Sequence, residues 1–139
     1  MFRHILVPFD ASQAASHAFD LAADLARLTG ARLTVLSVAQ VPELSETVGE
    51  VEDATQRAQG FLQVAMQRLL ARAELKGIPL ETRLEAGHPA DRILAFAEQN
   101  QVDLIVMGRR GLSGVARWVL GSVSDRVLQH APCPVLVVR

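Results

Sequence analysis

Short apolar runs alternate along the chain with longer segments whose apolar residues recur every three or four positions. Five runs have the length and aliphatic content of strands, and they cover residues 4–10, 32–39, 80–87, 102–108 and 134–138. Four segments between them have the spacing of amphipathic helices: from Ser12 to Gly30, about 52–76, 90–100 and about 122–130. The pattern therefore predicts strict alternation of strand and helix, beginning and ending with a strand.

This alternation predicts an α/β fold in three layers (α/β/α), with a doubly wound five-stranded parallel sheet between two layers of helices. A chain of 139 residues fits a single domain, residues 1–139. In such sheets ligands bind beyond the carboxyl ends of the strands, where the winding direction reverses. A ligand-binding site is therefore expected at the carboxyl ends of the strands.

Composition narrows the class of protein. The net charge of −1 and the scattered basic residues argue against a nucleic-acid binder. No apolar run approaches the roughly 20 residues that span a bilayer, so membrane insertion is not expected. Cys133 is the only cysteine, and no signal-peptide pattern precedes the first strand, which together predict a cytoplasmic protein. We interpret Cys133 as a packed apolar residue and not as a nucleophile.

The segment from Val41 to Gln56 is acidic, with five carboxylates and no basic residue before Arg57. We interpret it as a solvated surface connection that leads into the long helix. A mobile lid over a ligand is the alternative. The sequence does not assign a role to residues 43–53.

The stretch 108-GRRGLSGVARWVLGS-122 carries the candidate chemistry. Gly108 and Gly111 follow a strand, where glycine permits a positive φ or a bare backbone that faces a ligand. Gly121 and Ser122 open the last helix, with Ser122 as the expected N-cap, and a helix N-terminus attracts anions. Four arginines against Asp125 give this region a local charge of +3, which favours phosphate: Arg109, Arg110, Arg117 and Arg126.

Four stretches make the chain resemble the universal stress protein family over essentially its whole length. They are 5-ILVPFDAS-12, 104-LIVMGRRG-111, the pattern G-x2-G-x9-G-[ST] at Gly108, Gly111, Gly121 and Ser122, and 131-APCPVLVV-138. In that family the glycine pattern marks the members that bind ATP. The resemblance implies the strand order 3-2-1-4-5, which brings Asp10 beside the glycine stretch.

The resemblance also implies roles for individual residues. Asp10 would lie near the ribose, Val38 would offer backbone groups to the adenine edge, and Pro8 and Phe9 would shape the pocket wall. The predicted nucleotide-binding residues are Pro8, Phe9, Asp10, Val38, Met107, Gly108, Arg110, Gly111, Gly121, Ser122, Val123 and Ser124. The chain has Ala11 where relatives often have glycine, and alanine tolerates positive φ poorly, so this turn is expected to differ.

Three functions remain open. The first is a stress-response or regulatory protein that binds ATP, AMP or ADP, with the bound state as the signal and slow or no hydrolysis. The second is a weak Mg²⁺-dependent ATPase, with the ion held by ligand phosphates and Ser122. The third is a structural dimer without nucleotide. The only lysine, Lys76, lies far from the glycine stretch, and no metal-ligand or catalytic cluster is apparent.

The final run, 134-PVLVV-138, is apolar and should form an edge strand, which invites pairing. Family resemblance implies a homodimer through Pro134–Val138. The cluster Trp118, Val119 and Leu120 is interpreted as packing against the sheet, with a surface for an unidentified protein partner as the alternative.

Overall fold

The computed structural model of the chain describes residues 1–41, 47–109 and 122–139. In these ranges strands and helices alternate as predicted. The elements are β1 (His4–Pro8), α1 (Gln13–Thr29), β2 (Arg32–Gln40), α2 (Val48–Leu75), β3 (Glu81–Gly87), α3 (Pro89–Gln99), β4 (Leu104–Gly108), α4 (Ser122–His130) and β5 (Val135–Val138).

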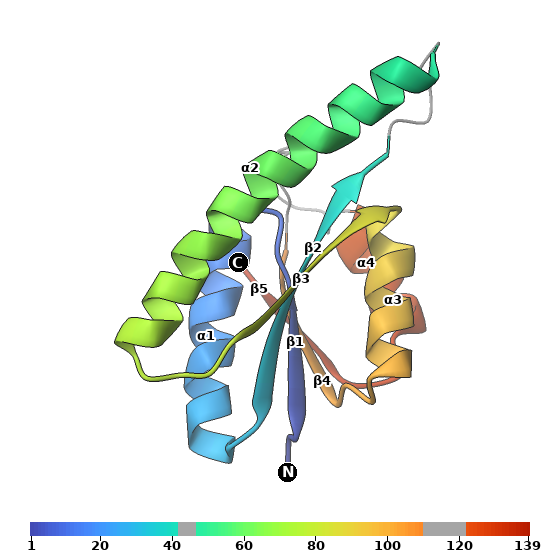
Figure 1. Ribbon diagram of the computed structural model, residues 1–139. Coiled ribbons are helices and arrows are strands. Elements are labelled where there is room, and N and C mark those ends of the chain that lie inside the picture. Colours follow the sequence, from blue (N-terminus) through green and yellow to red (C-terminus); the bar gives the residue numbers. More distant parts are fainter. Residues whose placement is uncertain (42–46, 110–121) are drawn as a thin grey trace.

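The strands form one parallel sheet in the order β3-β2-β1-β4-β5, which confirms the predicted architecture. Helices α1 and α2 cover one face of the sheet and α3 and α4 cover the other (Figure 1). Successive side chains of a strand point to opposite faces. Ile5 and Val7 therefore pack in the cluster under α1 and α2, whereas Leu6 packs in the cluster under α3 and α4.

Helix α1 has the termini that its sequence predicts. The Ser12 hydroxyl accepts a hydrogen bond from the Ala15 N–H at 3.1 Å, as an N-cap does. Gly30 follows the last turn with a φ of 72°, a left-handed conformation that favours glycine. The N-cap at Ser12 is important for the site, because it fixes the turn between β1 and α1.

Helix α2 begins earlier than predicted, at Val48 and not near residue 52. The Thr47 hydroxyl accepts from the Glu50 N–H at 3.1 Å and caps the helix, and a carboxylate in the first turn complements the helix dipole. The carboxylates from Glu50 onward are thus helical, while residues 42–46 lie outside the described part. The buried residues of α2 all lie in its C-terminal half: Leu62, Met66, Leu69 and Ala73.

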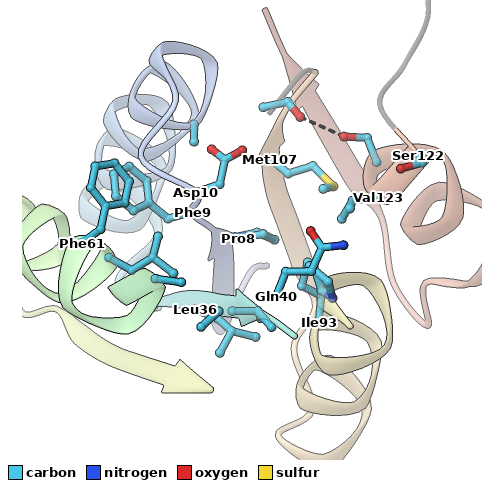
Figure 2. Close-up of a pocket in the computed structure, with 18 residues that line it drawn as sticks. Pro8, Phe9, Asp10, Leu36, Gln40, Phe61, Ile93, Met107, Ser122 and Val123 are labelled. Atoms are coloured by element: carbon cyan, nitrogen blue, oxygen red, sulfur yellow. Dashed lines mark hydrogen bonds between the residues drawn. The ribbon is translucent and has the colours of Figure 1, made fainter. Parts of the chain in front are cut away.

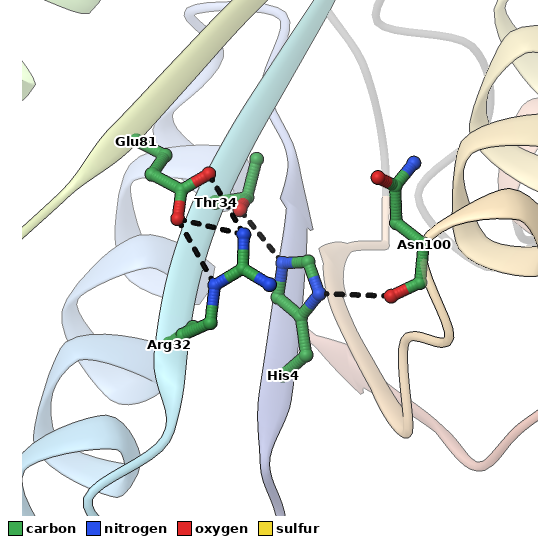
Figure 3. A network of polar contacts seen from close by, with 5 residues as sticks. All are labelled: His4, Arg32, Thr34, Glu81 and Asn100. Atoms are coloured by element: carbon green, nitrogen blue, oxygen red, sulfur yellow. Dashed lines mark hydrogen bonds and ion pairs between the residues drawn. The ribbon is translucent and has the colours of Figure 1, made fainter.

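A network of polar contacts lies at the amino ends of the strands (Figure 3). His4 is buried, with Nδ1 3.2 Å from the Asn100 carbonyl oxygen and Nε2 2.8 Å from the Thr34 hydroxyl. A carbonyl only accepts, so Nδ1 carries a proton in this pair. Arg32 forms an ion pair with Glu81 at 2.9 Å beside it. His4 is therefore a buried residue with a hydrogen-bond partner for each ring nitrogen. It lies at the amino ends of the strands, whereas ligands of such sheets bind at the carboxyl ends.

The described helices include none that is both long enough and apolar enough to cross a membrane.

Candidate functional site

A cavity of about 390 Å³ opens at the carboxyl ends of β1, β2 and β4 (Figure 2). Nine of the twelve predicted site residues line it: Pro8, Phe9, Asp10, Val38, Met107, Gly108, Ser122, Val123 and Ser124. The other three, Arg110, Gly111 and Gly121, lie outside the described residues. Segments nearly a hundred residues apart in sequence therefore meet at one edge of the sheet.

The turn after β1 aims a carboxylate at this cavity. The Ser12 N–H donates to Asp10 Oδ1 at 3.0 Å, which orients the side chain. Between these residues Ala11 has a φ of 68°. The turn thus takes the left-handed conformation that we expected alanine to avoid, at a strain of about 1 kcal/mol.

Gly108 ends β4 against the first turn of α1. A Cβ atom at Gly108 would lie 2.7 Å from the Ala15 nitrogen and 2.8 Å from the Ala14 carbonyl carbon. Its φ is not in the left-handed region, so positive φ is not the reason for glycine here. The structure requires glycine because strand and helix backbones approach too closely for any side chain.

Helix α4 is joined to β4 by a side-chain hydrogen bond. The Ser124 hydroxyl is buried and donates to the Gly108 carbonyl oxygen at 2.9 Å (Figure 2). Ser122 is the first residue of α4 and is exposed at the cavity, whereas we predicted it as the residue before the helix. Its position still places a hydroxyl beside the helix N-terminus, where anions are favoured.

The sequence predicted a local charge of +3 around the glycine stretch. Of the four arginines counted there, the structure describes Arg109 and Arg126. Arg126 forms an ion pair with Asp91 of α3 at 2.8 Å. The backbone N–H of Arg109 donates to the Val138 carbonyl at 2.6 Å and extends the ladder between β4 and β5. Backbone dipoles of α4 are therefore a more dependable source of positive potential at the cavity than Arg126.

The sequence did not single out the apolar side of the cavity. It is lined by Ala15, Leu36, Ala39, Ala58, Phe61, Leu62, Pro89 and Ile93, and the polar residue Gln40 lies among them. Ala58, Phe61 and Leu62 share one face of α2, because they lie three and four positions apart. This spacing was visible in the sequence, but only the fold shows that the face reaches the cavity. The cavity is thus polar toward Asp10 and α4, and apolar toward α2 and α3.

No group of three His, Cys, Asp or Glu side chains able to hold a metal ion occurs in residues 1–41, 47–109 and 122–139. Cys133 packs against the cluster under α3 and α4. Burial, and next the negative charge of Asp103, raise the pKa of the Cys133 thiol. A raised pKa keeps the thiol protonated and weakly reactive, in agreement with a packing role.

These features define a class: a doubly wound domain with a cavity at the switch point between β1 and β4. Residues 1–139 match the model of the universal stress protein family, and the chain belongs to this family. A relative in Staphylococcus haemolyticus is 37% identical over 142 residues, which cover 99% of this chain and 85% of the relative.

Two solved structures extend the comparison. The universal stress protein UspA from Lactobacillus plantarum has a TM-score of 0.87 and 31% identity, covering 99% of this chain and 98% of that one. A universal stress protein solved in complex with cAMP has a TM-score of 0.76 and 26% identity, with coverage of 99% and 97%. The second protein holds a cyclic adenine nucleotide on the same fold.

Proposed function

We propose that this chain binds an adenine nucleotide in the cavity at the carboxyl ends of β1, β2 and β4. The observation that carries the proposal is the two-sided lining: Asp10 and Ser122 on one side, and apolar residues of α2 and α3 on the other. A nucleotide has the same division, with a polar phosphoribose and a flat base. The related structure with cAMP supports this choice of ligand.

The lining suggests an orientation. Phosphates would lie at the start of α4, where the N–H groups of the first turn and the Ser122 hydroxyl would donate hydrogen bonds. The ribose hydroxyls would face the Asp10 carboxylate, which accepts hydrogen bonds. The base would then lie toward Val38 and the end of β2. Pro8, Phe9, Met107 and Val123 would contribute walls, and Arg110, Gly111 and Gly121 remain proposed phosphate contacts.

We infer further that the nucleotide is ATP and that the bound state acts as a signal in a stress response. Lys76, the only lysine, lies 3.8 Å from Asp20 between α1 and α2, and it does not line the cavity. Asp10 is the only carboxylate in the described lining, and we assign it to the ribose, so no residue of that lining is assigned to activate water. Mg²⁺ would be held by phosphate oxygens and the Ser122 hydroxyl, since this ion relies on substrate oxygens and water.

Isothermal titration with ATP, ADP, AMP and cAMP tests the proposal. We expect micromolar binding, about −8 kcal/mol, for at least one of them. Titrations in Mg²⁺ and in EDTA would show whether the ion contributes, and phosphate release would measure turnover. Absence of binding at millimolar concentrations of all four nucleotides would contradict the proposal.

We propose a homodimer through β5 as the assembly. This strand lies at the edge of the sheet, and Leu136 is 38% exposed on it. Pro134 and Val138 accept hydrogen bonds from β4 through their carbonyl oxygens. Since backbone groups alternate in direction along a strand, Val135 and Val137 direct theirs to the free edge. A second copy of β5 could pair there about a two-fold axis.

A further inference from the structure

Phe61 is a large aromatic residue at an unusual place on α2. It lines the cavity, yet its side chain is 55% exposed, whereas the adjacent Leu62 is 6% exposed. Figure 2 shows the Phe61 ring on the α2 side of the cavity, across from Ser122 and Val123. A half-exposed ring on a cavity wall offers a flat apolar surface to a ligand.

Gln40 is the second lining residue without a structural explanation. It ends β2 and is exposed, and its side-chain amide extends into the cavity (Figure 2). Within the part of the chain that the structure describes, this amide makes no hydrogen bond. A primary amide has an acceptor oxygen and donor hydrogens side by side. It can therefore match a ligand edge that presents one donor and one acceptor.

We propose that Phe61 and Gln40 together recognise a 6-aminopurine base: the ring packs on the face of the base and the amide pairs with its edge. The 6-amino group donates to Gln40 Oε1, and the neighbouring ring nitrogen accepts from Nε2, the pairing that glutamine makes with adenine elsewhere. This inference rests on the proposed nucleotide site and names the side chains that select its base.

The arrangement of the cavity agrees with this assignment. Asp10 lies in the turn after β1 and Ser122 begins α4, while Phe61 belongs to α2 and Gln40 ends β2. A nucleotide with its phosphate at α4 would place its base between Phe61, on the α2 side of the cavity, and Gln40 at the end of β2 (Figure 2). A volume of about 390 Å³ falls in the range of small-molecule sites, roughly 300–1,000 Å³.

Helix α2 offers a matched control for Phe61. Val64 is 53% exposed, three positions further along, and does not line the cavity. Phe61→Ala should weaken AMP binding about tenfold, within the range found when a ring that stacks on a base is removed. Val64→Ala should leave AMP affinity unchanged. Both variants should melt near the wild type, because each removes a half-exposed side chain.

The test of Gln40 uses a ligand that lacks one group. Purine riboside 5′-monophosphate is AMP without the 6-amino group. The wild type should bind AMP several-fold more tightly than this analogue. Gln40→Ala should reduce the preference at least threefold, chiefly by weakening AMP. Gln63→Ala, at an exposed α2 position outside the cavity, should keep the wild-type preference.

The outcomes separate the two proposals. If the wild type binds adenine nucleotides but Phe61→Ala binds AMP as well as Val64→Ala does, the role of the ring is wrong and the nucleotide site stands. An unchanged preference in Gln40→Ala would likewise overturn the role of the amide. If the wild type binds no adenine nucleotide, both the site and this inference are wrong.

Discussion

The hydroxyl of Ser124 donates to the carbonyl oxygen of Gly108 at 2.9 Å and so ties the first turn of α4 to the end of β4. Ser124 is 4% exposed, which shields this bond from water. The bond holds the two halves of the proposed phosphate site, the strand end and the helix N-terminus, in fixed relation. Ser124, a predicted ligand contact that lines the cavity, therefore also holds α4 and the end of β4 together.

Two serines of α4 should therefore have separable roles. Ser124→Ala removes the bond to Gly108 and should lower the free energy of unfolding by about 1 kcal/mol. Ser122→Ala removes an exposed hydroxyl at the cavity and should leave stability nearly unchanged while weakening nucleotide binding. Thermal denaturation and titration of both variants check this. Equal stability losses in the two variants would contradict the assignment.

Gly108→Ala should strongly destabilise the protein. Its Cβ would clash with the backbone of Ala14 and Ala15, which cannot move without shifting α1, and overpacking of this kind costs typically 1–3 kcal/mol. Gly60→Ala is the control, because a Cβ at this helical position meets nothing within 4 Å. That variant should gain roughly 0.5–1 kcal/mol. Urea denaturation of both variants measures the contrast, and a neutral Gly108→Ala would refute the close approach.

Ala11→Gly should stabilise the chain. Glycine relieves the left-handed strain of about 1 kcal/mol at a φ of 68°, and its greater freedom in the unfolded state offsets about half of this or more, leaving a gain of roughly 0.5 kcal/mol or less. Ala31→Gly is the contrast: like Ala11, Ala31 packs against the cluster under α1 and α2, but it has no positive φ, so the entropic and packing losses apply without any relief of strain. Chemical denaturation of both variants provides the measurement. A destabilised Ala11→Gly would mean that the turn differs.

Asp103 should make stability depend on acid pH. Burial raises the pKa of Asp103, but the backbone N–H groups of His4 and Arg3, at 3.0 and 2.8 Å, outweigh it, so the pKa lies below its ordinary value. A depressed folded-state pKa stabilises the fold above the unfolded value, about 3.9, and this stabilisation is lost as pH falls through the folded-state pKa.

Denaturation at pH 7 and pH 3 tests this prediction. The stability difference between wild type and Asp103→Ala should be larger at pH 7, where the carboxylate accepts both hydrogen bonds. Asp24→Ala removes only an exposed ion pair with Arg27 and should change stability little at neutral pH. An equal effect of Asp103→Ala at the two pH values would contradict the role of its charge.

Two substitutions on β5 test the proposed dimer. Val137→Pro removes an N–H that faces the free edge, and it leaves the hydrogen bonds that Pro134 and Val138 accept from β4. Leu136→Arg places a charge on the exposed side of the strand. Sedimentation should show monomers for both variants and a dimer for the wild type. If both variants sediment as the wild type does, the interface lies elsewhere.

The sequence predicted most of the fold because each local signal agreed with the others. Apolar runs marked the strands, Ser12 and Gly30 bounded α1, and the resemblance supplied the strand order. The start of α2 was missed because Thr47 caps a helix within a segment whose carboxylates indicated a solvated connection. Nine of twelve site residues line the cavity, since strand ends and the glycine pattern are local features.

What only the tertiary structure decided is which local features meet. Gly108 looked like a ligand-facing glycine, but the backbone of α1 excludes a side chain there. Ser124 was predicted only as a binding residue, and the structure shows that its hydroxyl is bonded to the Gly108 carbonyl oxygen. Phe61 and Gln40 gave no signal of chemistry, because their importance depends on α2 and β2 reaching the same cavity. Sequence periodicity fixes which face of an element is apolar, whereas long-range packing decides what that face meets.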